Sequence, residues 1–314
     1  MDKHPHSHLS MLQRFGRSIT RMMAWLAIWL VSSPLMAAPM VVVHNGPEAS
    51  GDTRQDYYWQ LLRAALDITR PQYGDYVLRA HPELLPHQRA VAAVQSGQGP
   101  INIICRGLND DLAARLLPVM LPLDKGLLGT RLMLVTEATQ RKLDQLADVQ
   151  GLKRFSVGQS ATWADAQVLR QAGFSLVLTD NYESLFRMLD AGRFDLLPRG
   201  LVEIEGEFAH YRHNLPGLRI ESRFMLQYPL SRYFMVGRSA EGERMAARIR
   251  DGLHALQRSG EFDRRYAAFK REVLKGLSLK GRMVMHLPNP LLQSDVPFDD
   301  PHWWDKLGAE LGQP

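Results

Sequence analysis

Residues 156–174, SVGQSATWADAQVLRQAGF, contain a short apolar run, a polar loop and a helical pattern in that order. The pattern predicts a strand over 155–158 and a helix over 163–172. Gly173 follows the helix, as expected for a C-terminal cap. A strand that enters a loop and then a helix is the repeating unit of α/β proteins, so this stretch indicates an α/β fold.

The same alternation extends to both sides of this stretch. Short strands bounded by helical patterns favour a parallel sheet with crossover helices. Strands are predicted at 40–44, 77–80, 101–105, 131–136, 175–178, 194–197 and 232–236, and helices at 55–69, 86–96, 139–146, 182–191, 200–213, 241–258 and 261–274. From residue 283 the chain is rich in proline and is predicted to be irregular. Trp303 and Trp304 suggest that this tail packs on the body of the protein.

The first 37 residues have the pattern of an export signal. Arg14, Arg17 and Arg21 precede an apolar run at 22–31, which residues 32–34 (SSP) break, and residues 35–37 (LMA) offer a cleavage site. The run has ten residues, whereas a membrane-spanning helix needs ~20. We expect the signal to be cleaved, the alternative being an uncleaved anchor. The working part of the chain is therefore predicted to lie in the periplasm.

This leader also carries most of the basic excess. Removing residues 1–37 takes away four basic residues and one acidic residue, and lowers the formal charge from +5 to +2. The remaining charge is too small to indicate a nucleic-acid partner. His4, His6 and His8 lie in the leader, so no metal site is predicted from them, and no cofactor is predicted. The only cysteine, Cys105, lies in an apolar stretch and is expected to be a buried strand residue.

Three stretches together resemble the periplasmic solute-binding proteins of the amino-acid-binding type, in a branch where the protein stands alone. Residues 121–135 (LPLDKGLLGTRLMLV), 156–174 and 182–204 (YESLFRMLDAGRFDLLPRGLVEI) resemble the hinge entry, the ligand loop and the second-lobe strand, and 228–236 resembles the return crossing. The resemblance implies a type II periplasmic-binding fold, α/β, with two lobes, each a mostly parallel sheet flanked by helices, and a two-strand hinge. The expected boundaries are 1–37 for the leader, 38–133 and 230–285 for lobe 1, 134–229 for an inserted lobe 2, and 286–314 for the irregular tail.

The resemblance implies that the chain captures a small solute by hinge closure and delivers it to the membrane subunits of an ABC transporter. A separate membrane sensor is the alternative partner, and a monomer is expected. The solute would be anionic or zwitterionic, either amino-acid-like or a carboxylate. Members of this family usually place an acid after the strand corresponding to 194–197, where it holds the ammonium of the ligand. Here Pro198-Arg199-Gly200 places a cation instead.

The loop after the strand at 155–158 is the first predicted part of the ligand site. Ligands of open α/β sheets bind at the carboxyl ends of strands, and the first amides of a helix accept anionic groups. Gln159, Ser160, Thr162 and Trp163 are therefore predicted to bind ligand. The structural alternative is that Thr162 only caps the helix.

Two arginines are predicted to bind the anionic group. Arg199 ends a buried-looking strand, and its planar fork suits a carboxylate, although it could instead pair with Glu203 one helical turn away. Arg115 falls where the resembling family keeps its carboxylate-binding arginine, and Arg106 is the alternative if the alignment is shifted by one turn. We expect Arg115 and Arg199 to face one another across a cleft. Asn45 and Tyr57, which follow the first strand, complete the predicted ligand set.

An enzymatic role is not predicted. The chain has no Gly-x-Ser-x-Gly elbow, no phosphate loop ending in Gly-Lys-Ser/Thr and no His-Glu-x-x-His motif. A hydrolase would need the folded cleft to bring Ser160 or Thr162 against a histidine or a carboxylate.

Overall fold

The computed structural model describes residues 38–47, 55–290 and 300–312. The predicted leader lies outside the described residues. Residues from Met40 onward form one compact unit. Within the described ranges, no helix is both long enough and apolar enough to cross a bilayer.

The first sheet has the strand order β2-β1-β3-β11-β4. Its members are β1 (Met40–His44), β2 (Tyr76–Ala80), β3 (Ile103–Gly107), β4 (Leu117–Pro118) and β11 (Arg232–Val236). Strand β1 pairs in parallel with β2 and β3, whereas β11 runs antiparallel to β3 and β4. The helices that follow these strands are α2 (Asp56–Ile68), α3 (Arg70–Tyr73), α4 (His87–Ser96), α5 (Asp110–Arg115), α10 (Ala240–Arg258) and α11 (Glu261–Val273).

The second sheet has the order β12-β10-β5-β8, with β9 also paired to β5. Its members are β5 (Thr130–Thr136), β8 (Leu197–Gly200), β9 (Leu218–Ile220), β10 (Phe224–Gln227) and β12 (Met283–His286). Strands β6 (Ser156–Gln159) and β7 (Ser175–Leu178) pair beside it, and a bridge from Val157 to Leu196 joins them to it. The helices here are α6 (Glu137–Leu143), α7 (Ala164–Gln171), α8 (Tyr182–Asp190) and α9 (Leu201–Tyr211).

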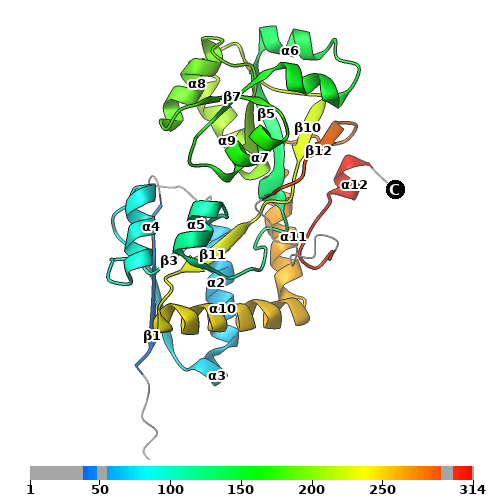
Figure 1. Ribbon diagram of the computed structural model, residues 1–314. Helices are drawn as coiled ribbons and strands as arrows, with labels where there is room; N and C mark the ends of the chain where they lie inside the picture. The colour runs from blue at the N-terminus through cyan, green and yellow to red at the C-terminus, as the bar shows by residue number, and fades with distance from the viewer. Residues whose placement is uncertain (1–37, 48–54, 291–299, 313–314) are drawn as a thin grey trace, which may run out of the picture. The chain divides into compact units, whose positions relative to one another are not determined.

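The predicted α/β class, with sheets flanked by helices, is confirmed (Figure 1). The sheets are mixed, however, rather than mostly parallel. The strands that carry the chain from one sheet to the other, β5 and β11, run antiparallel to most of their neighbours. Strand β5 follows the passage into the second sheet, and β11 follows the passage back to the first. Because β11 brings the chain back, it runs antiparallel to its neighbours β3 and β4.

Helices α2 and α10 show why the first sheet has a firm core. Helix α2 places Leu61, Leu62 and Ala65 on one face, and all three are fully buried. Gly252 of α10 lies so close to the backbone of Ala65 that any side chain there would overlap it. Cys105 on β3 belongs to the same apolar cluster and is buried, as predicted. Burial raises the pKa of its thiol to about 12.

The passage between the sheets differs from the predicted two-strand hinge. The chain leaves the first sheet after β4, returns between β10 and β11, and crosses a third time from α11 to β12. Residues 283–285, expected in lobe 1, therefore belong to the second sheet. Strand β12 (Met283–His286) pairs in parallel with β10 and forms the edge of the second sheet.

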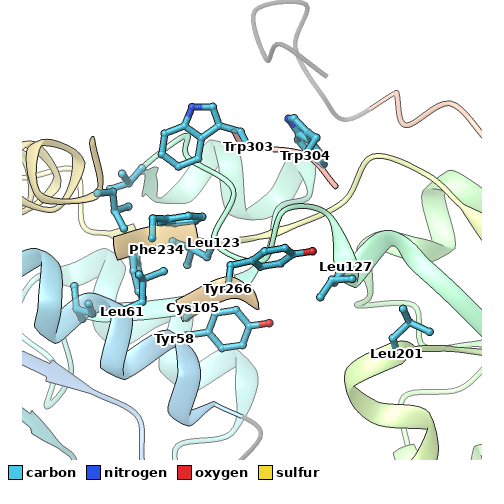
Figure 2. Packing of buried hydrophobic residues seen from close by; sticks show 14 of the residues in the cluster. Tyr58, Leu61, Cys105, Leu123, Leu127, Leu201, Phe234, Tyr266, Trp303 and Trp304 are labelled. Atoms are coloured by element: carbon cyan, nitrogen blue, oxygen red, sulfur yellow. The ribbon is translucent and has the colours of Figure 1, made fainter. Parts of the chain in front are cut away.

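The C-terminal tail is also more ordered than predicted, since it contains β12 and α12 (Gly308–Leu311). Its predicted packing on the body is confirmed, because Trp303 and Trp304 are each only 7% exposed. Figure 2 shows both tryptophans in the cluster that also holds Phe234 and Leu123. The backbone amide of Asp305 donates to the carbonyl of Lys125 in the hinge at 2.9 Å.

A close backbone approach fixes the hinge. Gly129 precedes β5, and a Cβ there would overlap the carbonyl oxygen of Tyr228 on the returning segment. We therefore expect Gly129→Ala to lower the free energy of unfolding by roughly 1–3 kcal/mol. Gly206→Ala is the matched control, because Gly206 is exposed on α9 with open space around it. It should raise stability by ~0.5–1 kcal/mol. Urea unfolding of both variants measures the difference, and equal stability of the two would contradict this account of the hinge.

Candidate functional site

A cavity of about 340 Å³ is lined by residues from both sheets. The first sheet and its loops contribute Arg106, Gly107, Asn109 and Arg232, among others, and the second contributes Arg131, Trp163, Asp165, Tyr182, Arg199 and Glu203. This volume falls in the range of sites for small molecules. The described lining includes four arginines but only two carboxylates, so the cavity has a cationic character.

Glu203 lies at the centre of the charged wall. Its carboxylate accepts a hydrogen bond from the amide of Gly200 at 3.1 Å, which fixes the start of α9. The same carboxylate pairs with Arg199 at 3.1 Å and with Arg131 at 3.4 Å. Burial alone would raise the pKa of Glu203, but the guanidiniums of Arg199, Arg131 and Arg232 outweigh it and hold the pKa at about 2.

Arg199 is fixed from several sides. It lies in β8, one residue before the end of the strand, is 4% exposed, and pairs with both oxygens of Glu207 at 2.6 Å. Its guanidinium lies 4.4 Å from the ring centroid of Trp163, a cation–π contact. The hydroxyl of Tyr182 donates to Glu207 at 2.6 Å and so helps to hold the carboxylate that binds Arg199. The alternative that Arg199 pairs with Glu203 is confirmed, with Glu207 as an additional partner.

A second buried pair stands beside the first. Arg131 on β5 binds Asp165 of α7 at 2.6 Å and donates through Nε to the hydroxyl of Tyr228 at 3.1 Å. Tyr228 in turn donates a short hydrogen bond to Asp165. Charges buried in this way are tolerated only when paired and hydrogen-bonded. The positive charges of Arg131 and Arg199 on the wall of the second sheet are thus paired with carboxylates of the same sheet and its helices.

Arg232, on the wall contributed by the first sheet, has fewer partners than Arg131 and Arg199. Arg232 begins β11 opposite Gly107 of β3, and the adjacent register pairs Tyr233 with Arg106. The nearest ion-pair partner of Arg232 is Glu203, at 3.8 Å. Its Nε is buried and has no hydrogen-bond partner. His87 also lines the cavity, and burial with the nearby charge of Arg106 lowers its pKa to about 4, so its imidazole is neutral at neutral pH.

Two hydrogen bonds join segments that follow strands of the two sheets, next to the cavity. Gln167 of α7 donates to Asp110 of α5 at 3.0 Å, and the side chain of Asn109 donates to the carbonyl of Thr162 at 3.5 Å. Both involve exposed side chains, so they can break without leaving a buried polar group unpaired. Such contacts suit a cleft that opens and closes.

Three of the predicted ligand residues line the cavity, namely Thr162, Trp163 and Arg199. Gln159 and Ser160 are buried next to this loop but are not part of the lining. Thr162 does not cap α7 as predicted, because Trp163 occupies the N-cap position and the Thr162 hydroxyl bonds that of Ser160 at 2.9 Å. These two hydroxyls therefore contact each other rather than a histidine or a carboxylate.

The other three predicted residues lie elsewhere. Asn45 exchanges hydrogen bonds with the backbone of Leu85, and Tyr57 donates to the carbonyl of Leu123. Arg115 ends α5, where it pairs with Asp111 at 3.2 Å and donates to Gln95 at 2.9 Å. The prediction that Arg115 and Arg199 face one another is therefore wrong, because local carboxylates and amides hold both side chains.

The sequence did not identify several lining residues, chiefly Asn109, Tyr182 and Arg232, and it offered Arg106 only as the alternative to Arg115. Arg106 lies near the end of β3 and Asn109 just after it, as Gln159 ends β6, and this shared position at the carboxyl end of a strand was the available signal. The described residues do not gather three His, Cys, Asp or Glu side chains that could hold a metal ion.

No protein-family model and no curated protein matches this chain. Among solved structures it is similar to an ancestral arginine-binding protein bound to arginine, with 16% identity over 74% of this chain and 98% of that chain and a TM-score of 0.49. It is also similar to a histidine kinase sensor domain with similarity to periplasmic binding proteins (17% identity, 73% and 96% coverage, TM-score 0.47). A third is the substrate-binding protein of an amino acid ABC transporter (11% identity, 74% and 99% coverage, TM-score 0.48). All three scores are below 0.5, so the function of this chain rests on its own cavity.

The charged wall predicts a specific dependence of stability on pH. Because the folded-state pKa of Glu203 is about 2 instead of its usual 4.5, its stabilising contribution is complete above pH 4.5 and is lost as the pH falls through 2. Glu203→Gln should lower the free energy of unfolding at pH 7 by ~3 kcal/mol, since it removes a partner from buried ion pairs.

The loss should shrink as the pH falls from 4.5 towards 2, which urea titrations at several pH values would measure. Glu205→Gln is the control, because Glu205 lies two residues away on α9 and forms none of the ion pairs of the wall. Equal losses for the two variants, or a loss for Glu203→Gln that does not depend on pH, would contradict this description of the wall.

Proposed function

We propose that this chain is an extracytoplasmic solute-binding protein that captures a small anionic or zwitterionic solute by hinge closure. The observation that carries the proposal is a single cavity whose cationic lining comes from both sheets. A solute held between Arg232 on one side and Trp163 on the other would contact both sides at once. It would therefore bind the closed arrangement better than an open one, and this difference in affinity drives closure.

The export pattern of residues 1–37 supports a site of action in the periplasm, with the solute delivered to the membrane subunits of an ABC transporter. A membrane sensor could receive the closed protein in the same way. The chain would act as a monomer, since the cavity is complete within one copy.

Ligand binding is tested with a thermal and chemical stability screen against amino acids, hydroxy acids, dicarboxylates, sugar acids and short peptides. A true ligand at a hundred times its dissociation constant should raise the free energy of unfolding by about 2.7 kcal/mol. The radius of gyration from small-angle scattering should fall in the same samples. Stabilisation by none of these classes would overturn the proposal.

The position of the site is tested with Trp163→Ala. Loss of the indole removes a lining surface and the cation–π contact of Arg199, so we expect ligand affinity to fall by at least tenfold. Tyr57→Phe is the control, because Tyr57 was also predicted to bind ligand but donates to Leu123 outside the cavity. Isothermal titration should show unchanged affinity for Tyr57→Phe. A loss of affinity in Tyr57→Phe without a loss in Trp163→Ala would place the site elsewhere.

A further inference from the structure

The cavity wall holds two buried polar atoms that have no hydrogen-bond partner, Arg232 Nε and Gln55 Oε1. One is a charged donor and the other an acceptor. A buried polar group without a partner is costly, and a native structure usually has a reason for each. Both residues line the same cavity, so a ligand there could satisfy both atoms.

The guanidinium of Arg232 is held in position by its neighbours, but its Nε has no hydrogen-bond partner. Its guanidinium stacks over the ring of Tyr58 at 5.3 Å from the centroid, and its Nη2 is 3.8 Å from Glu203, beyond hydrogen-bond distance. The nearby carboxylate of Asp124 is fully buried, does not line the cavity, and accepts hydrogen bonds from Tyr58 and Ser231. A ligand carboxylate would supply the charge-assisted partner that Arg232 lacks.

Each carboxylate of the described lining is already paired with arginine through one of its oxygens, Oδ1 of Asp165 and Oε2 of Glu203. Asp165 is bound by Arg131 and Tyr228, and Glu203 by Arg131, Arg199 and the amide of Gly200. Four arginines but only two carboxylates line the cavity, so an ammonium group on the ligand would add positive charge to a lining that already has an excess of it. Gln55 Oε1, by contrast, needs only one neutral donor such as a hydroxyl.

We propose that the ligand is a small hydroxy acid, a carboxylate that carries a hydroxyl where an amino acid carries its ammonium. Arg232 binds the carboxylate, Arg106 lies beside it on the neighbouring strand, and Gln55 accepts from the hydroxyl. This assignment rests on the proposed function of the cavity and names the class of solute that it selects.

Isothermal titration of the full chain with matched pairs of probes tests the assignment. Each pair differs only in the group on the second carbon: L-lactate against L-alanine, L-malate against L-aspartate, L-2-hydroxyglutarate against L-glutamate, and L-3-phenyllactate against L-phenylalanine. In each pair that binds, the hydroxy acid should bind at least tenfold more tightly. Arg232→Gln should weaken its binding at least tenfold, whereas Arg115→Gln should leave it unchanged.

The outcomes are separable. Equal or tighter binding of the amino acids to the unmodified protein would overturn the assignment without any reference to a variant that could misfold. Loss of affinity in Arg115→Gln but not in Arg232→Gln would also overturn it. If neither series binds but another solute class does, the assignment fails and the proposed function stands. If no solute binds, both fail.

Discussion

The carboxylate of Glu203 is the interaction on which the site depends. It accepts the amide of Gly200 and is paired with Arg131 of β5 and Arg199 of β8, while Arg232 of β11 approaches it from the first sheet. Arginines on strands of both sheets thus lie close to one largely enclosed carboxylate. Since an uncompensated buried charge is far more costly than a surface charge, these groups must assemble together or not at all.

The compensation is uneven, and the unevenness gives the cavity its chemistry. On the second sheet, Arg131 and Arg199 are bound to carboxylates and tyrosines, so they shape the wall but have little capacity left for a ligand. On the first sheet, Arg232 keeps a buried donor without a partner. The second sheet supplies a preorganised surface with Trp163 on it, and the first supplies the arginine whose Nε lacks a hydrogen-bond partner. Preorganisation of this kind lowers the entropic cost of binding.

Local patterns were enough to predict most elements. The amphipathic run of α2, the apolar runs of β1 and β5 and the glycine after α7 are all read from neighbouring residues, and the structure has these elements within a few residues of the predicted bounds. The pair of Arg199 with Glu203 was also accessible, since it spans one helical turn. The pairing of β12 with β10 could not be predicted in this way, because nothing in the four residues of β12 specifies β10 as its neighbour.

The site itself was harder to predict, since it depends on contacts distant in sequence. Arg232 lies opposite Gly107, and only the pairing of β11 with β3 brings it to the cavity. Glu207 reaches Arg199 from eight residues away because a strand turns into a helix between them. Arg115 was placed by resemblance alone, and its own helix supplies the carboxylate that holds it.

The central claim is that the cavity between the two sheets is the ligand site and that Arg232 is its anchor. A crystal structure of the protein with its tightest-binding solute from the screen tests this most directly. The account predicts ligand density inside the cavity, with an anionic group within hydrogen-bond distance of Arg232 Nε and with Arg199 still bound to Glu207. Density at Arg115, or an Arg199 released from Glu207 to bind the ligand, would contradict it.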